Sequence, residues 1–343
     1  MNEVFNMRSA LEQDIEATPE AIKQALSVCT QNDRLKFNSV KLSKGYLQGL
    51  SMIIITGAGS SYRAGSACAY NTELLCDIPT IAIHSQLLMN ASGVPSKSTL
   101  VIAVSSSGED NDTVFAAKRA LRNGARVLAV APNESTLAKM CKGCIELSDC
   151  ADNLCAFEEE YFLLSLLSIY IGGKIGYMPK LNISVTLKLA EMLSGKLSFS
   201  LHGRRALEEA AEYMSSFSEI VFCGYATDEA IAQEISEKFR LFTEKSAYAL
   251  PIYDVDNPPE NSENTLIVPI ISNNANAGLI ASELNRIKSE YANTLIFTTE
   301  SIAQECEIRD ATVTVEDSIP LFNPIIITGA LMKSLSSFQT DSE

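Results

Sequence analysis

The sequence predicts an α/β protein with two successive parallel β-sheets, each doubly wound with helices on both faces, and three observations support this prediction. Short, continuously apolar runs alternate with helical segments along the chain, which is typical of parallel strands buried on both faces. Several of these runs end in glycine and small polar residues, as strand-to-helix turns do. The 343 residues, of which 46% are apolar and 20% charged, are enough for two domains with sizeable cores.

The same series of elements occurs twice. Four pairs of segments match, namely SMIIITGAGSS with SEIVFCGYATDE, STLVIAVSSSGE with NTLIVPIISNNA, ARVLAVAPNES with ANTLIFTTESI, and CIELSD with TVTVED. Gly57 and Gly224 lie 167 positions apart, and so do Leu128 and Leu295. Because chance similarity between short apolar runs would not keep one register over four elements, we infer a tandem repeat of one doubly wound domain.

The elements follow one another in a regular order. Residues 1–50 show helical periodicity, and the first apolar strand begins at Ser51. In the first copy the strands Leu100–Val104 and Val127–Ala131 flank a helix, Asn111–Asn123, which Gly124 ends at the usual C-terminal position. The predicted parts are an N-terminal helical segment (1–50), a first domain (51–180), a helical linker (181–217) and a second domain (218–343).

Charge and hydropathy exclude several classes of partner. A net charge of −15 argues against nucleic acid and against an anionic membrane surface, because both are bound through basic patches. No run of about 18 apolar residues is free of polar interruption, and the acidic N-terminus has neither a basic nor an apolar leader region. We therefore expect a cytoplasmic protein with neither nucleic acid nor a membrane as a partner.

The nine cysteines indicate reduced thiols. Their odd number and their scatter through predicted regular structure do not fit a disulfide framework. One cluster, made of Cys141, Cys144, Cys150 and Cys155, contains a C-x-x-C pair, which leaves a zinc site as an alternative. The second pair lacks that tight spacing and Cys144 leads into an apparent strand, so we expect no metal site.

Two strand ends in the first copy have the composition of an anion site. The residues after these strands are Gly57, Gly59, Ser60 and Ser61, and then Ser105, Ser106, Ser107 and Gly108. Glycine lets the backbone approach a ligand, hydroxyls donate hydrogen bonds, and a helix start presents free N–H groups. Because doubly wound sheets bind ligands at the carboxyl ends of their strands, these residues predict a phosphate site. The alternative is a turn in which a serine caps the helix and nothing binds.

Two features bear on this predicted site. Glu109 and Asp110 follow the serines directly, and carboxylates repel an anion. The second copy has GYATDE and ISNNAN at the matching strand ends, so we expect one anion site per chain.

The loops GAGSSY and SSSGEDNDT resemble the C-G-T-S-Y and S-Q-S-G-E-T-x-D-T loops of the sugar isomerase (SIS) family, and LEQDIEATPEAIKQAL resembles the helical opening of that family. The family includes phosphosugar isomerases, fructosamine-type deglycases and aminosugar-phosphate deaminases. The resemblance implies two tandem flavodoxin-like domains, a small-molecule sugar phosphate as ligand, no cofactor and a homodimer. It also implies a phosphosugar pocket made of Gly59, Ser60, Ser61, Ser105, Ser106, Ser107, Gly108, Asp110 and Thr113, with Asp110 in place of the family's threonine.

The second copy departs from the family at its catalytic positions. Lys238 lies where the family has a lysine, but Leu241 replaces its catalytic glutamate, and the stretch Asp256–Pro258 lacks its histidine. Isomerase chemistry needs a general base. We therefore predict a catalytic set of Lys238, Glu234 and Glu237, which share one side of a helix. The alternative for these three residues is a solvated helix surface.

Two further groups have both a functional and a structural interpretation. Glu158, Glu159 and Glu160 lie where the family reads A-S-T-K and offer another base, although acids also favour a solvated first turn. His84 follows an apolar run and is interpreted as a structural strand-end residue, with ligand contact as the alternative. Two functions are thus open: a phosphosugar isomerase, deglycase or deaminase, and a non-catalytic protein that binds a sugar phosphate.

Overall fold

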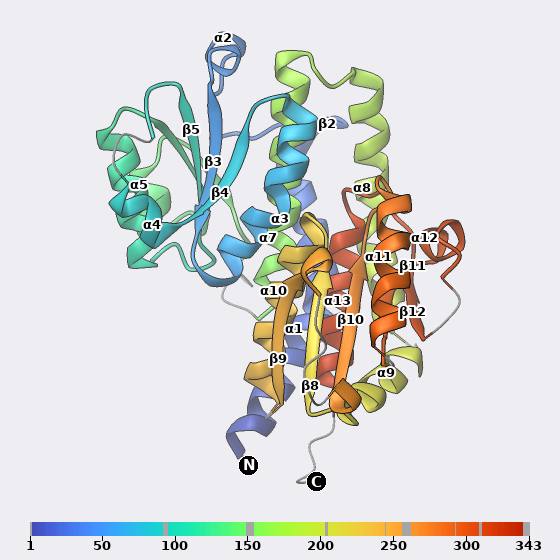
Figure 1. Ribbon diagram of the computed structural model, residues 1–343. Helices are drawn as coiled ribbons and strands as arrows, with labels where there is room; N and C mark the ends of the chain where they lie inside the picture. Colours follow the sequence, from blue (N-terminus) through green and yellow to red (C-terminus); the bar gives the residue numbers. More distant parts are fainter. Residues whose placement is uncertain are drawn as a thin grey trace. The chain divides into compact units, whose positions relative to one another are not determined.

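The computed structural model describes residues 2–91, 95–148, 154–202, 205–243, 245–255, 262–291, 293–308 and 311–338. The chain divides into a first unit, Ala17–Ser194, and a second unit made of Met1–Glu16 and Gly195–Glu343. Two long helices, α1 (Asn2–Cys29) and α8 (Lys180–Leu201), contribute residues to both units. Each unit contains one five-stranded parallel sheet, as predicted (Figure 1).

The sheet of the first unit has the strand order β4-β3-β5-β6-β7. Its strands are β3 (Met52–Gly57), β4 (Thr80–His84), β5 (Thr99–Val104), β6 (Arg126–Ala131) and β7 (Cys144–Glu146). All neighbouring strands are parallel, so their C-terminal ends lie at one edge of the sheet. β5 is buried along its whole length, as its continuous apolar run predicts.

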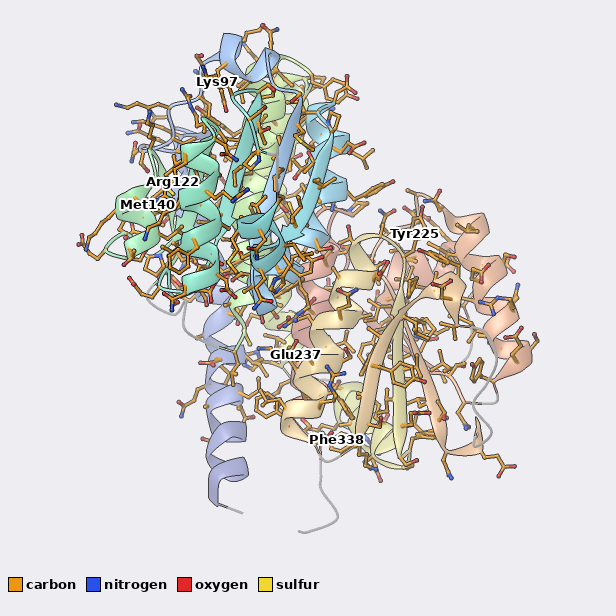
Figure 2. All side chains as sticks on the ribbon, turned by 60° about the vertical axis from the view of Figure 1, so that its left-hand side comes forward. Lys97, Arg122, Met140, Tyr225, Glu237 and Phe338 are labelled. Atoms are coloured by element: carbon orange, nitrogen blue, oxygen red, sulfur yellow. The ribbon has the colours of Figure 1, made fainter. Side chains whose placement is uncertain are left out.

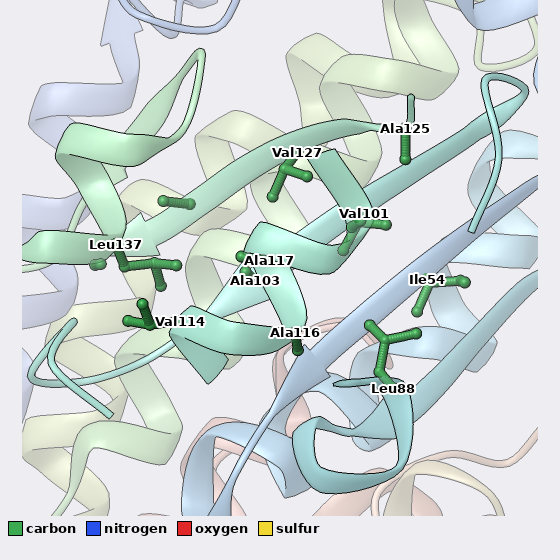
Figure 3. Close-up of a cluster of buried hydrophobic side chains, with 13 residues drawn as sticks. Ile54, Leu88, Val101, Ala103, Val114, Ala116, Ala117, Ala125, Val127 and Leu137 are labelled. Atoms are coloured by element: carbon green, nitrogen blue, oxygen red, sulfur yellow. The ribbon is translucent and has the colours of Figure 1, made fainter. Parts of the chain in front are cut away.

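Helices cover both faces of this sheet. They are α3 (Gly59–Cys76), α4 (Ser85–Asn90), α5 (Asn111–Arg122), α6 (Thr136–Met140) and α7 (Ala156–Ile175). On one face α4, α5 and α6 pack on the strands, and Figure 3 shows this core, in which Ile54 and Val101 share a cluster with Leu88 and Ala116. On the other face α3 packs on β3 and β4, and α7 packs on α3.

The sheet of the second unit has the order β9-β8-β10-β11-β12. Its strands are β8 (Glu219–Gly224), β9 (Ser246–Pro251), β10 (Thr265–Ile271), β11 (Ile296–Thr299) and β12 (Thr312–Val315). Numbered along its own segment, each sheet therefore has the order 2-1-3-4-5, which is that of flavodoxin-like folds. The repeat is an inference from the sequence, and the shared strand order agrees with it.

The second sheet is also covered on both faces. The helices of this unit are α9 (Arg205–Ser215), α10 (Thr227–Phe242), α11 (Ala277–Glu290), α12 (Glu300–Glu305) and α13 (Asn323–Ser336). On one face Leu284 of α11 and Ile302 of α12 share a buried cluster with Ile271. On the opposite face Phe239 of α10 contacts the ring of Phe222 on β8.

The remaining elements are short. They are the antiparallel hairpin of β1 (Thr30–Gln31) and β2 (Arg34–Leu35), the helix α2 (Lys44–Gln48), and two 3₁₀ turns, Ile252–Asp254 and Ser262–Asn264. Among the described residues, no helix combines the length and the apolar content that a bilayer crossing requires.

The first strand-to-helix turn of each sheet contains a residue with a positive φ. Gly59 begins α3 with a φ of 53°, and Ala226, which lies 167 positions later, precedes α10 with a φ of 52° and a ψ of −111°. These angles of Ala226 are close to those of the first central residue of a type II′ turn, a position that glycine dominates. Ala226 therefore holds a strained backbone conformation, next to the Tyr225 labelled in Figure 2.

Replacement of Ala226 by glycine is expected to stabilise the protein. Ala226→Gly removes the Cβ that makes this conformation costly, so the free energy of unfolding should rise by about 1 kcal/mol. The midpoint of urea unfolding measures the change. Ala232→Gly, in the buried interior of α10, is the matched control and should lose about 1 kcal/mol or more. Equal destabilisation by both variants would contradict the assignment of strain.

Candidate functional site

The predicted phosphosugar residues gather at the C-terminal edge of the first sheet. In the parallel register Gly57 of β3 lies opposite His84 of β4, and Thr56 lies opposite Ala103 of β5. The loops that follow β3 and β5 therefore leave the sheet side by side. The predicted residues belong to these two loops and to the first turns of α3 and α5, all within the first unit.

Ser105 and Ser107 keep their hydroxyl protons available. The Ser105 Oγ accepts a hydrogen bond from the N–H of Gly108 at 3.0 Å, and the Ser107 Oγ accepts one from the N–H of Glu109 at 3.2 Å. A hydroxyl has one proton and two lone pairs, so each serine still has a donor. Within the described part of the chain, these two protons and the N–H groups of Ser106 and Ser107 have no acceptor. The loop thus presents several donors together.

The two acids behind the serines are each hydrogen-bonded to a threonine. Glu109 accepts bonds from the N–H and the hydroxyl of Thr136, both at 2.7 Å, and these bonds lower the pKa of Glu109. Asp110 is the N-cap of α5 and accepts bonds from the N–H and the hydroxyl of Thr113 at 2.8 and 2.7 Å. Both carboxylates therefore stabilise helix starts, which explains why acids follow a predicted anion site.

In the structure no serine caps either helix, and whether a ligand binds these loops stays a prediction. Asp110, and not a serine, caps α5, and the N-cap of α3 is Ala58, which makes no side-chain cap bond. The serines of the two loops are thus not needed to begin the helices that follow them.

Gly108 fixes the path of the loop Ser105–Gly108, which we call the serine loop. Its φ is 67°, and a Cβ at this position would lie 2.2 Å from the Oγ of Ser135. Its carbonyl oxygen accepts a bond from the N–H of Leu137 at 3.0 Å. Only glycine combines this conformation with this close approach, so the loop after β5 is held against the start of α6.

Ser61 and Glu160 form a buried pair. The Ser61 hydroxyl donates to Oε1 of Glu160 at 2.7 Å, and the two residues are 6% and 0% exposed. The Nη2 of Arg63 donates to the Oγ of Ser60, the neighbour of Ser61, at 3.4 Å. A guanidinium group therefore lies at the start of α3. Sequence reasoning missed the bond to Glu160, because 99 positions separate the two residues.

The expectation that Glu158, Glu159 and Glu160 form a solvated helix start is wrong. All three are buried, since α7 is apolar around almost its whole circumference and lies within the core of its unit. Glu159 accepts bonds from the N–H and the hydroxyl of Ser148 at 2.8 and 2.7 Å. Burial raises the pKa of Glu159, against the effect of these bonds.

Buried hydroxyls link the ends of β3 and β4 to the start of α5. The Ser85 Oγ lies 2.9 Å from the Oγ1 of Thr113 and 3.3 Å from the Oγ1 of Thr56. The Thr56 hydroxyl donates to the carbonyl of Ile83, and the Thr113 hydroxyl donates to Asp110. The Ser85 hydroxyl therefore donates to the nearer of the two threonine oxygens, which is that of Thr113. In this arrangement the Thr113 hydroxyl has no proton left for a phosphate.

His84 has structural contacts at the end of β4. Its Nδ1 accepts a bond from the N–H of Gln86 at 3.3 Å, and its ring meets Tyr62 edge-on with 5.3 Å between centroids. These contacts agree with the structural interpretation of His84, and contact with a ligand stays a prediction.

The predicted catalytic set lies on α10 of the second unit. Glu234 and Lys238 are buried, at 1% and 9% exposure, and the Lys238 Nζ lies 3.5 Å from Oε1 of Glu234. The alternative of a solvated surface is therefore wrong for this pair, whereas Glu237, labelled in Figure 2, is exposed and its role stays a prediction. Leu241, which the resemblance to the SIS family aligns with a catalytic glutamate, is 51% exposed.

The corresponding edge of the second sheet holds a carboxylate of its own. Ser272 follows β10 as Ser105 follows β5, and Asp228 lies 167 positions after Ser61. The Asp228 Oδ2 accepts a bond from the N–H of Ser272 at 3.0 Å, and its Oδ1 accepts one from the Ser272 hydroxyl. The Nδ2 of Asn323 donates to the Ser272 carbonyl at 3.0 Å. The Asp228 carboxylate thus accepts the hydrogen bonds from Ser272 that an anionic ligand at this strand end would need.

Sequence reasoning overlooked this carboxylate, although the repeat offset could have found it. The same offset that pairs Gly57 with Gly224 pairs Ser105 with Ser272 and Ser61 with Asp228. At this end of the second sheet the donors of Ser272 are taken by Asp228, and the expectation of one anion site per chain stays a prediction.

The described residues contain no group of three or more His, Cys, Asp or Glu side chains that could hold a metal ion. Burial raises the pKa of the Cys141 thiol to about 12 and that of Cys144 to about 11. Cys155 is buried. Cys150 and the stretch Asp256–Pro258 lie outside the described residues.

Residues 47–156 match the family model described as the SIS domain. The chain is also 25% identical over 324 residues to the glutamine–fructose-6-phosphate aminotransferase (isomerizing) of Fusobacterium nucleatum, an alignment that covers 91% of this chain and 53% of that protein. The corresponding enzyme of Caldanaerobacter subterraneus is 20% identical over 321 residues, with the same coverage of 91% and 53%. The chain thus spans about half the length of these curated relatives.

Solved structures share the fold. The C-terminal domain of glucosamine-fructose-6-phosphate aminotransferase from Francisella tularensis superposes with a TM-score of 0.87 at 17% identity, covering 96% of this chain and 94% of that one. Tagatose-6-phosphate ketose/aldose isomerase from Escherichia coli gives a TM-score of 0.69 at 16% identity, with coverage of 95% and 92%. At these identities the similarity establishes the fold alone.

Gly108 is expected to tolerate no side chain. Gly108→Ala adds a Cβ to a left-handed residue and places it against Ser135, so the free energy of unfolding should fall by about 2–4 kcal/mol. Urea unfolding measures the loss. Gly45→Ala is the control, because a Cβ at Gly45 meets nothing within 4 Å, and its effect should stay within about 1 kcal/mol. Similar effects of the two substitutions would show that Gly108 does not constrain the loop.

Asp228 is expected to give the protein a specific pH dependence of stability. Burial raises its pKa from 3.8 to about 7, against the hydrogen bonds from Ser272. Between about pH 4 and pH 7 the folded protein therefore retains a proton that the unfolded chain has released, so this group lowers the free energy of unfolding as pH rises through that window.

Asp228→Asn should remove this contribution, which urea unfolding at a series of pH values between about 4 and 7 measures. Asp112→Asn, on the first turn of α5, is the control and should retain it. If Asp228→Asn keeps the full pH dependence of the wild type, Asp228 does not titrate in this range.

Proposed function

We propose, from the match of residues 47–156 to the SIS domain model, that this chain binds a phosphorylated sugar and holds the phosphate on the loop Ser105–Gly108. One observation carries this proposal: Ser105 and Ser107 use their lone pairs to bind backbone N–H groups and keep their O–H donors. Donors that are held in place before the ligand arrives need little reordering when it binds.

The surroundings of the loop also suit a phosphate. The loop leads into α5, a helix of 12 residues whose N-terminal N–H groups and dipole favour negative charge. Glu109 and Asp110 are hydrogen-bonded to Thr136 and Thr113, so their oxygens do not occupy the donors of the serines. Arg63, at 3.4 Å from the Ser60 Oγ, adds a positive group near the neighbouring loop.

The proposed reaction is a proton transfer between neighbouring carbons of an open-chain hexose or aminosugar phosphate, as in isomerases, deglycases or deaminases. Such a step needs a general base and a donor that stabilises the developing negative charge. We retain Glu234, Glu237 and Lys238 as the proposed catalytic set, and the buried ion pair of Glu234 with Lys238 supplies a carboxylate and an ammonium group together. Glu160 is the alternative base, because it is buried and in contact with Ser61.

A second candidate function is sugar-phosphate binding without catalysis. It is favoured by Leu241, an exposed apolar residue at the position of the family's catalytic glutamate. Under this proposal the chain senses or sequesters the ligand that the serine loop holds. We further propose, under either function, a homodimer, as the resemblance to the SIS family implies, and a cytoplasmic location, as the charge and hydropathy of the sequence suggest.

Thermal unfolding with hexose, hexosamine and fructosamine phosphates tests the binding proposal. A ligand at about 100 times its Kd stabilises the folded state by about 2.7 kcal/mol, which raises Tm by several degrees. Ser105→Ala/Ser107→Ala should abolish this shift, because both free hydroxyl donors are lost. Ser27→Ala, at an exposed serine that bonds only within α1, is the control and should retain it.

Each ligand that raises Tm is then assayed for turnover. Product formation by the wild type would identify an enzyme. A decrease of about 100-fold or more in Glu234→Gln or Lys238→Met would then identify the base. Binding without product would favour the non-catalytic function. No stabilisation by any of the phosphates would refute the phosphate loop.

A further inference from the structure

One cavity in the first unit lies away from the serine loop. Its volume is about 600 Å³, and its walls come from the β1–β2 hairpin, the end of α7 and the start of α8. We call it the hairpin cavity and define it by Arg34, Leu35, Tyr170, Lys174, Lys180 and Ile183. None of the residues that line it belongs to the loops after β3 or β5.

The charge of this cavity is opposite to that of the whole chain. Arg34, Lys174 and Lys180 line it together with a single acid, Asp33, whereas the chain has a net charge of −15. Among the residues that the structure describes, none of these three cations forms an ion pair with a carboxylate. Like charges that share one cavity repel one another, and an anionic ligand would relieve this repulsion.

The cavity also has apolar walls. Leu35, Ile169 and Ile183 line it, and the ring of Tyr170 lies beside the Lys174 ammonium, which is 5.0 Å from its centroid and 2.9 Å from its hydroxyl. Small-molecule sites are commonly clefts of roughly 300–1,000 Å³ with mostly apolar walls and a few placed polar groups. The hairpin cavity has this size and this combination of groups.

The frame of the cavity is regular secondary structure. Asn32 and Asp33 have φ of 51° and 56°, which places both central residues of the hairpin in the left-handed region of a type I′ turn. The hairpin therefore positions Arg34 by its backbone, while α7 positions Tyr170 and Lys174 four residues apart on one side of the helix. Such a site needs no loop to order when a ligand binds.

We propose that the hairpin cavity binds a small organic anion with an apolar body, its negative group placed among Arg34, Lys174 and Lys180. A free inorganic anion would leave the apolar walls unused, and a polyanion would meet the acidic surface of the rest of the chain. This site does not depend on the proposed sugar-phosphate function, because it shares no residue with the serine loop.

The test uses two fluorescent probes of nearly equal shape and different charge. 8-Anilinonaphthalene-1-sulfonate is an apolar anion, and N-phenyl-1-naphthylamine is its neutral counterpart. Titration of the full chain should show one site for the sulfonate and binding of the neutral probe that is weaker by about tenfold. Equal affinity for both probes would refute the proposal, because the cations would then contribute nothing.

Variants locate the probe. Lys174→Gln/Lys180→Gln should weaken sulfonate binding by about tenfold and leave binding of the neutral probe unchanged. Lys97→Gln/Lys118→Gln makes the same change of charge at two exposed lysines that do not line the cavity, and it should have no effect. Loss of binding in both double variants would show a general charge effect and would overturn the assignment.

Two further variants keep the test decisive if the first one is unstable. Arg34→Gln removes the cation on the hairpin without changing α7 or α8, and it should weaken sulfonate binding alone. Ile183→Ala shortens an apolar wall and should weaken both probes. Unchanged affinity of the sulfonate in Arg34→Gln and Ile183→Ala would place the probe elsewhere and refute the site.

Discussion

One interaction shapes the C-terminal edges of both sheets: a carboxylate accepts the backbone N–H and the hydroxyl of the same serine or threonine. It joins Glu109 to Thr136, Asp110 to Thr113, Glu159 to Ser148, Asp228 to Ser272, and Asp317 to Ser301. Hydrogen bonds to charged groups are stronger than neutral ones. Acids therefore position loops at these edges, so Glu109 and Asp110 can lie beside the predicted anion site.

The two sheets use this interaction with different consequences for ligands. At the first sheet Glu109 and Asp110 bind threonines of the helix starts and leave the donors of Ser105 and Ser107 unoccupied. At the second sheet Asp228 binds Ser272, the residue that corresponds to Ser105. At the first sheet the hydroxyl donors of Ser105 and Ser107 are therefore open to a ligand. At the second sheet the donors of Ser272 are already bonded to Asp228.

The sequence predicted the architecture well because parallel strands buried on both faces leave a local pattern of apolar runs. It also placed Ser105 to Gly108 at a strand end. It did not predict the burial of Glu159 or of the pair Glu234 and Lys238, because acids in a first turn and charged residues four apart look like solvated surface. The partner of Glu159 is a serine on a separate loop, and only the folded chain brings it within reach.

The bond from Ser61 to Glu160 has a consequence for the direction in which a ligand would lie. Ser61 gives its proton to the carboxylate, so any ligand atom that reaches its oxygen must bring a proton of its own, as a sugar hydroxyl does. Ser105 and Ser107 still have protons to give, so they suit an acceptor such as a phosphate oxygen. Under the proposed function, Ser61 on the first turn of α3 is therefore suited to a hydroxyl of the sugar, and the loop after β5 is suited to its phosphate.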